Sequence, residues 1–322
     1  MNSFKKIAGV AGLLLFTLIL AATLSDSFLS SFNIENLIRR SSLIGILSIG
    51  VAFVIITGGI DLSIGSVVCL VGCLTPFLIT KWEWHPALAL AAMALLSLTI
   101  GLTHGLLITK LRLQPFIVTL CGLLIYRGIT RGLVADQTQG FAGGFKGLRW
   151  VAKGQIDLPG LDFGLPVPAI VLVVLAAAAI YLLNYTVWGR YMMAIGQNEK
   201  AALYSGISTD RVTILAYVIC SLIAGVGGVL YVFDFGSAQP VDFGNFFELY
   251  AIAGAVLGGC SLRGGEGTII GVIIGAAVMQ VLKNMITLVD FFSSSIEYAV
   301  IGVVILMGVM ADEAIRRFAS RK

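Results

Sequence analysis

Charged side chains are scarce in this sequence. Asp, Glu, Lys and Arg make up 12% of its 322 residues, whereas hydrophobic residues make up 58%. Soluble domains carry roughly 25% charged residues, because a folded surface must be covered with polar groups. The composition therefore excludes an ordinary soluble protein and a large extramembrane domain, and it predicts a chain that folds within a lipid bilayer.

Groups that carry chemistry are also few. There are two histidines, and we interpret His104, which lies within an apolar run, as a packing or hydrogen-bonding residue rather than a proton relay. No phosphate-binding loop of the form G-x-x-x-x-G-K-[ST] occurs, which excludes ATP hydrolysis by that route. The five cysteines lie in or beside apolar runs, so we interpret them as small buried hydrophobic residues. We expect no catalytic residue, metal or cofactor in this chain.

Apolar runs dominate what is present. A helix needs about 20 apolar residues to cross the hydrocarbon core. We predict an all-α integral membrane protein in which residues 1–322 form one transmembrane domain. The ten expected crossings cover residues 7–24, 41–57, 62–80, 87–109, 116–134, 167–183, 212–233, 249–257, 268–289 and 296–310. The first run reads as a membrane anchor rather than a secretory signal, because it is long and no clean cleavage site follows.

Three polar connections join these runs. Residues 25–40 carry apolar residues at helical spacing, which predicts a short helix along the interface that does not span. Residues 135–166 form the main extramembrane loop, and residues 185–211 form a second polar loop. Cations are retained on the cytoplasmic side. Their excess lies on the side of residues 185–211 and of both termini, which we therefore place in the cytoplasm. Arg39 and Arg40 lie on the opposite side and do not fit this scheme.

The strongest local feature is Thr57-Gly58-Gly59-Ile60-Asp61-Leu62-Ser63, where paired glycines interrupt an apolar run. Glycine permits a sharp turn, and an Asp at the start of a helix can accept its free amide protons, which predicts a structural cap. Irregular backbone at membrane depth is tolerated only against protein or along a polar cavity. The same residues therefore also predict part of a translocation path, and the two interpretations are compatible.

A second interruption, Gly258-Gly259-Cys260-Ser261, follows an unusually short apolar run. Glycine-interrupted spans in the two halves of a transporter indicate its permeation path. The outline repeats that of Gly58-Gly59, which is compatible with an internal duplication or with chance. On a later span, Gln280 and Asn284 share a helix face with Lys283, and we predict that this polar stripe also lines the path.

The polar loop 185–211 contains a self-terminated helix. Asn198 can cap a helix over residues 198–204, with Glu199 in its first turn and Gly206 just past its end. Two spans can be joined without such a helix, so we predict a docking surface; a plain interfacial helix is the alternative. Its candidate docking residues are Gln197, Asn198, Glu199, Lys200, Ala201, Ala202, Ser205 and Gly206.

These segments resemble the ribose-type sugar permeases of ABC transporters, within the branched-chain amino acid and sugar permease superfamily. The resemblance rests on residues 55–66, on Ala194-Ile195-Gly196-Gln197-Asn198 with Ser205-Gly206-Ile207, and on Leu257-Gly258-Gly259 with residues 264–268. It implies a type II importer-like permease in a bacterial inner membrane that forms a homodimer; a heterodimer with a paralogue is the alternative. It also implies a cytoplasmic ATPase that binds ATP and Mg²⁺ and docks on residues 197–206, and a periplasmic sugar-binding protein.

The resemblance implies a mechanism of alternating access, in which the ATPase drives a passive helical bundle and the cargo is a ribose-like pentose, a hexose or a related small polyol-like solute. Sugars are neutral and strongly hydrated, which suits a chain with few intramembrane charges. The alternatives are an ion-coupled transporter, which would need an intramembrane acid such as Asp61 or Glu297, and a scaffold or membrane enzyme, which would need large loops or a catalytic cluster.

Overall fold

The computed structural model describes residues 3–157, 159, 163–288, 298–300, 302, 303, 306, 307 and 310. Within this part of the chain, 7 helices are long and apolar enough to cross a membrane. They are α1 (Ser3–Leu24), α2 (Ser31–Ile56), α4 (Pro86–Lys110), α5 (Pro115–Val134), α7 (Val167–Ile180) with the π-helical turn η1 (Tyr181–Tyr185), α10 (Thr209–Phe235) and α12 (Ile269–Leu288). Two shorter apolar helices are α3 (Ile64–Thr80) and α11 (Phe247–Leu257). The run expected over residues 296–310 falls largely outside the described residues.

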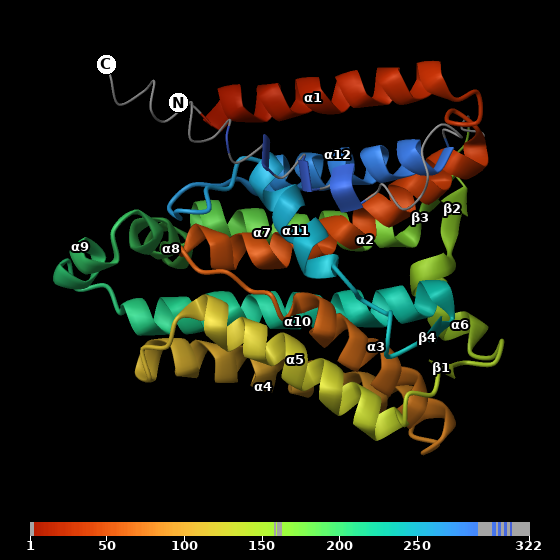
Figure 1. Cartoon of the computed structure of the whole chain (residues 1–322), viewed down its shortest axis with the longest axis horizontal. Helices are drawn as coiled ribbons and strands as arrows, with labels where there is room; N and C mark the ends of the chain where they lie inside the picture. Colours follow the sequence, from red (N-terminus) through yellow and green to blue (C-terminus); the bar gives the residue numbers. More distant parts are fainter. Residues whose placement is uncertain are drawn as a thin grey trace.

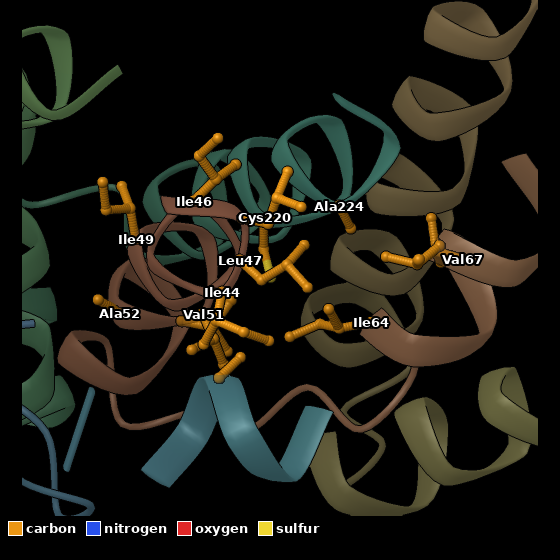
Figure 2. Packing of buried hydrophobic residues seen from close by; sticks show 14 of the residues in the cluster. Ile44, Ile46, Leu47, Ile49, Val51, Ala52, Ile64, Val67, Cys220 and Ala224 are labelled. Atoms are coloured by element: carbon orange, nitrogen blue, oxygen red, sulfur yellow. The ribbon is translucent and has the colours of Figure 1, made fainter. Parts of the chain in front are cut away.

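Helix α2 forms the centre of the bundle. Every residue from Ser42 to Ile56 is buried, as expected for a helix that is apolar on all sides and surrounded by others. Helices α7, α10, α11 and α12 pack around it. Figure 2 shows the branched side chains of α2, such as Leu47 and Val51, meeting Cys220 and Ala224 of α10 and Ile64 of α3. This core positions the interrupted segments described below.

The short interfacial helix expected within residues 25–40 is wrong. Helix α2 begins at Ser31, where the Ser30 hydroxyl accepts the amide proton of Asn33, and it runs without a break to Ile56. Residues 31–44 contain no glycine or proline that could interrupt the helix. The residues that we assigned to the interface are therefore the first turns of the central helix.

Arg39 and Arg40 are neutralised where they lie on α2. Arg40 Nη1 lies 3.1 Å from Asp234 Oδ2, and Arg39 Nη2 lies 2.6 Å from Glu35 Oε1. The Arg40 guanidinium also lies 4.5 Å from the centre of the Phe235 ring. Partly buried cations of this kind are paired rather than free, which explains how two arginines are accommodated at positions where the charge pattern does not expect them.

The two ends of the bundle carry different structures (Figure 1). At one end lie α8 (Val187–Gln197) and α9 (Glu199–Tyr204). At the other, β1 (Gln139–Gly140) pairs antiparallel with β4 (Ser237–Ala238), and β2 (Gln155–Asp157) pairs with β3 (Gly164–Pro166) beside α6 (Lys146–Lys153). The registers are Gln139 opposite Ala238 and Gln155 opposite Pro166. The loop expected over residues 135–166 is therefore a small folded cap on the bundle.

Candidate functional site

The first irregular segment, residues 57–63, joins α2 to α3. Helix α2 ends at Ile56, and Gly58 adopts a φ of +83°, which a residue with a side chain rarely adopts. The chain then turns back into the bundle before α3 begins (Figure 1). The Ile60 carbonyl accepts hydrogen bonds from the Tyr217 hydroxyl at 3.1 Å and from Thr119 Oγ1 at 3.4 Å. Side chains of α5 and α10 thus satisfy a backbone group that the broken helix leaves free, as the bilayer interior requires.

Asp61 organises this segment. Its Oδ1 accepts hydrogen bonds from the Ser63 amide at 2.8 Å and the Ser63 hydroxyl at 2.6 Å, and the residue is only 1% exposed. The described residues donate no hydrogen bond to Oδ2. Asp61 therefore fixes the turn that leads into α3. The expectation that it accepts the free amide protons of the helix is wrong in detail, because its partner is the amide of Ser63, the residue just before α3.

His104 lies beside this segment and is 1% exposed. Its Nε2 lies 2.9 Å from the Tyr126 hydroxyl, and its ring stands edge-on to that of Tyr217, with 6.4 Å between the ring centres. The interpretation of His104 as a packing and hydrogen-bonding residue is confirmed. It links α4 to α5 and α10 around the first irregular segment.

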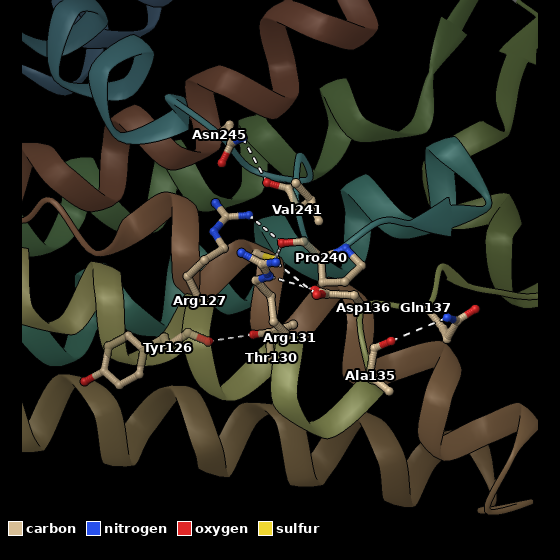
Figure 3. Close-up of polar contacts among 11 residues, drawn as sticks. Tyr126, Arg127, Thr130, Arg131, Ala135, Asp136, Gln137, Pro240, Val241 and Asn245 are labelled. Carbon is tan, nitrogen blue, oxygen red and sulfur yellow. Dashed lines mark hydrogen bonds and ion pairs between the residues drawn. The ribbon is translucent and has the colours of Figure 1, made fainter.

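A second irregular segment, residues 239–246, leads into α11 and reaches the same region. Arg127 of α5 donates through Nη1 to the carbonyl of Pro240 at 3.1 Å (Figure 3). The same Nη1 also donates to the carbonyl of Phe243 at 2.6 Å. A β-carbon built on Gly65, at the start of α3, would meet the Gly244 carbonyl and Glu248 Oε2. The first turns of the two short helices α3 and α11 therefore meet inside the bundle, each preceded by non-helical backbone.

The interruption predicted at Gly258-Gly259 is a separate feature, and it is present. Gly258 and Gly259 do end α11, but Ser261 follows in a compact turn, in which the Ser261 amide donates to the Glu266 carbonyl at 3.1 Å. Residues 234–248 lie between the expected crossings 212–233 and 249–257. A usable signal was the spacing of Gly236, Pro240 and Gly244, because such residues also mark non-helical backbone buried in protein.

Glycine also permits α11 and α12 to approach closely. A β-carbon on Gly258 would meet the Gly271 carbonyl, and one on Gly275 would lie 2.5 Å from the Gly258 amide nitrogen. Small residues four apart on both helices, Gly254 with Gly258 and Gly271 with Gly275, form this crossing. Gly258 thus packs two helices together, in addition to ending one of them.

The polar stripe on α12 lies elsewhere. Asn284 exchanges side-chain hydrogen bonds with Asn33 of α2 at 3.1 and 2.8 Å. Asn33 lies near the start of α2, roughly 35 Å along the helix from Ile56 at 1.5 Å per residue. Gln280 is partly buried on the same helix, and the Lys283 ammonium lies 4.9 Å from the centre of the Tyr250 ring. Asn284 therefore lies beside the start of α2, far from the first irregular segment.

The helix predicted over residues 198–204 is present as α9. The Asn198 side chain accepts the Ala201 amide proton at 3.0 Å, and Gly206 follows the helix with a φ of +83°. Ala202 is 5% exposed and fixes the helix to the bundle, whereas Leu203 is 54% and Tyr204 89% exposed. The other candidate residues, Gln197, Glu199, Lys200, Ala201, Ser205 and Gly206, are exposed as well. Sequence reasoning missed Leu203 and Tyr204, although two large apolar residues in a polar loop were a signal.

The described residues contain no group of three or more His, Cys, Asp or Glu that could hold a metal ion. Of the cysteines, Cys121 is exposed on α5, so the interpretation of all five as buried is wrong for that residue. Its position on an outward face of an apolar helix is compatible with contact to lipid. The site therefore consists of a partly buried irregular segment (residues 57–63), a second irregular segment (residues 239–246) in which only Pro240 and Gly244 are buried, and an exposed helix at one end of the bundle.

Comparisons with known proteins agree with this architecture. Residues 33–309 match the family described as branched-chain amino acid transport system / permease component. The chain is 36% identical over 301 residues to the ribose import permease protein RbsC of Escherichia coli (strain K12), covering 93% of this chain and 91% of the relative. It is 37% identical over 308 residues to RbsC of Bacillus subtilis (strain 168), covering 96% and 92%.

A further relative is the xylose transport system permease protein XylH of Escherichia coli (strain K12), at 29% identity over 367 aligned positions, with 98% of this chain and 92% of the relative covered. No solved structure matches the chain significantly. The resemblance to ribose-type ABC permeases is confirmed, and the chain is a multi-pass membrane protein. It belongs to the family of branched-chain amino acid transport system permease components.

Proposed function

We propose that this chain is the membrane-spanning subunit of an ATP-driven importer and that it carries a monosaccharide or a related small polyol-like solute. The relatives are named for the transport of ribose and xylose. A neutral, hydrated cargo needs hydroxyl, amide and backbone groups along its path rather than charges. The observation that carries the proposal is α9, a self-capped helix that exposes its large apolar side chains at one end of the bundle.

Helix α9 is the docking surface for the ATPase in this proposal. Tyrosine and leucine side chains exposed on a rigid, anchored helix suit a protein partner that buries them. Lys110 and Arg112 lie at the same end, where Asp210 pairs with both at 2.7 and 3.4 Å. A cation-rich end of the bundle is expected in the cytoplasm, where a nucleotide-binding subunit operates.

The translocation path runs along the two irregular segments in this proposal. Broken helices at membrane depth provide backbone polar groups, as interrupted helices do in other transporters. The Thr57, Gly58, Gly59, Asp61 and Ser63 segment borders the path together with residues 239–246. ATP binding to the partner then moves α9, and the bundle alternates between openings to the two sides.

The complete assembly contains further parts. We propose ten crossings with both termini in the cytoplasm of a bacterial inner membrane, with residues 135–166 on the periplasmic side. A second permease chain, identical or paralogous, completes the path. ATP and Mg²⁺ bind the partner ATPase, and a periplasmic binding protein delivers the sugar. The strand-capped end of the bundle, opposite α9, is where that protein would dock (Figure 1).

The docking assignment is tested with Tyr204→Ala, which removes an 89% exposed aromatic side chain from α9. Interface tyrosines that act as hot spots contribute about 2 kcal/mol or more, so we expect roughly thirtyfold weaker association with the ATPase. Co-purification or a binding titration of the detergent-solubilised complex measures this. Trp150→Ala is the matched control, because Trp150 is 51% exposed on α6 at the opposite end. Equal binding by Tyr204→Ala and wild type would remove the assignment.

The ion-coupled alternative needs an intramembrane acid such as Asp61 or Glu297. Glu297 lies outside the described residues, and Asp61 Oδ2 accepts no hydrogen bond from the described residues. In an ion-coupled carrier an intramembrane acid would have to exchange a proton or cation. Family membership favours the ATP-driven reading, in which Asp61 holds the turn before α3. The two readings are separated by the Asp61 variant considered below.

A further inference from the structure

Three glycine-containing segments that are far apart in the sequence meet at one point. They are the break after α2, the C-terminal turn of α8, and the turn between α11 and α12. A β-carbon built on Gly264 would lie 2.8 Å from the α-carbons of both Gly58 and Gly196. We call Gly58, Gly196, Gly264 and Gly265 the glycine junction.

Backbone contacts hold this junction together. The Gly265 amide donates to the Ile56 carbonyl at 2.8 Å, so the last residue of α2 is tied directly to the α11–α12 turn. A β-carbon on Gly196 would meet both atoms of that bond, the Ile56 oxygen and the Gly265 nitrogen. A β-carbon on Gly265 would lie 2.8 Å from the Gln197 amide nitrogen. Without side chains between them, the three backbones have no room to slide independently.

Gly58 and Gly196 adjoin parts of the candidate site, and Gly264 and Gly265 follow the C-terminal end of α11. Gly196 lies two positions before Asn198, the N-cap of α9. Gly58 begins the irregular segment that contains Asp61, and Gly264 and Gly265 lie in the turn that joins α11 to α12. The junction therefore connects the exposed helix α9 to the two short helices that meet inside the bundle.

We propose that the glycine junction is the joint through which a movement of α9 reaches both interrupted helices, and that Gly196 and Gly264 act as positioning residues for transport. The proposal rests on α9 as the ATPase docking helix. The three backbone segments stay in contact through the transport cycle, and we call this state of the joint closed. They transmit force, because backbone segments in direct contact cannot absorb a displacement as flexible side chains do.

Gly196→Ala tests the joint without imposing a strained φ, since Gly196 lies within α8 and its φ is not positive. The added methyl group separates Ile56 from Gly265. We expect unchanged co-purification with the ATPase and retained ATP hydrolysis. Sugar uptake should fall about tenfold or more, and hydrolysis should no longer respond to the sugar-loaded binding protein. Gly132→Ala is the matched control, because a β-carbon on this α5 glycine meets nothing within 4 Å.

Gly264→Ala provides a second variant with its own control. Gly264 has a φ of +86° and close neighbours, whereas Gly143 has a φ of +79° and open space around it. Both substitutions impose similar backbone strain, so only the Gly264 variant should uncouple hydrolysis from uptake. Normal sugar uptake by Gly196→Ala or Gly264→Ala, with the ATPase bound, would overturn the proposal that the glycine junction is a joint. Loss of ATPase binding by Tyr204→Ala is independent of this result, so the two proposals fail separately.

If the variants do not reach the membrane, amide hydrogen exchange on the wild-type complex tests whether the junction stays closed. The Gly265 amide should exchange slowly both without nucleotide and with MgATP, because its bond to Ile56 persists while the joint is closed. Faster exchange of this amide in either state would show that the junction opens, and would overturn the proposal.

Discussion

At the scale of single residues, long side chains satisfy the backbone that the interrupted helices leave free. Arg127 holds two carbonyls of residues 239–246, and Tyr217 and Thr119 hold the Ile60 carbonyl. The glycine breaks could be predicted from sequence, because Gly58-Gly59 interrupts an apolar run. The partners could not, since Arg127 and Pro240 lie 113 positions apart and only the packing of α5 against the second segment brings them together.

Replacing Arg127 tests this role. Arg127→Met keeps an apolar stem but leaves the carbonyls of Pro240 and Phe243 without their donor. Hydrogen bonds to charged groups contribute about 1.5–3 kcal/mol, so we expect a fall in stability of that order, measured as a lower midpoint of thermal unfolding in detergent or nanodiscs. Arg131→Met is the matched control. Arg131 pairs with Asp136 at an exposed helix end, at 2.7 Å, and its loss should leave the midpoint unchanged.

The exposed pair has an electrostatic signature of its own. The hydrogen bond from the Arg131 guanidinium holds the pKa of Asp136 below its usual value. The carboxylate form is therefore the one that the fold favours, and this small contribution is lost as the pH falls through the lowered pKa. Arg131→Met should return the Asp136 pKa to its ordinary range, which a carboxyl titration by NMR can detect. An unchanged pKa would contradict the pairing.

Asp61→Asn separates a structural from an ion-coupling role. The amide oxygen can still accept from the Ser63 amide and hydroxyl, and no buried charge remains, so we expect normal yield and ATP-driven uptake. Asp61→Ala removes the acceptor and should destabilise the protein by about 1 kcal/mol or more, visible as a lower unfolding midpoint. Uptake that is abolished in a stably folded Asp61→Asn protein would show that the carboxylate itself is required.

At the scale of elements, the apolar runs predicted where most helices lie. They did not predict where a helix begins or whether it continues through a polar stretch. Helix α9 is confirmed, because its cap and terminator lie within the helix itself. The separate helix before residue 41 is wrong, since α2 continues through Arg39 and Arg40, whose charges are compensated by Asp234 and Glu35. Nor could the sequence show that Pro240 and Gly244 are buried, because their burial depends on contacts with α3 and α5.

The close crossing of α11 and α12 gives a prediction at this scale. In Gly275→Ala, the new methyl group would meet the Gly254 carbonyl and the Gly258 amide nitrogen. Overpacking of this kind costs about 1–3 kcal/mol, so the unfolding midpoint should fall. Gly128→Ala, where a β-carbon meets nothing within 4 Å, should leave the midpoint unchanged or raise it slightly through better helix propensity. A Gly275 variant as stable as wild type would contradict the close crossing.

At the scale of the whole molecule, one end of the bundle carries the exposed helix α9, and the interior contains the interrupted helices. Composition predicted the membrane, and the motifs predicted the permease family. The meeting of three distant glycines could not be predicted, because no local pattern relates Gly58, Gly196 and Gly264. In our account the chain supplies the path and the joint, whereas the free energy for transport comes from ATP bound to another subunit.

Reconstitution into sealed vesicles tests that claim most directly. The purified chain is incorporated alone or with its ATPase, and accumulation of radiolabelled ribose is measured with the binding protein present. The account predicts accumulation against a gradient only with the ATPase and MgATP, and none by the chain alone under an imposed proton or sodium gradient. Concentrative uptake by the chain alone, driven by either ion gradient, would contradict it.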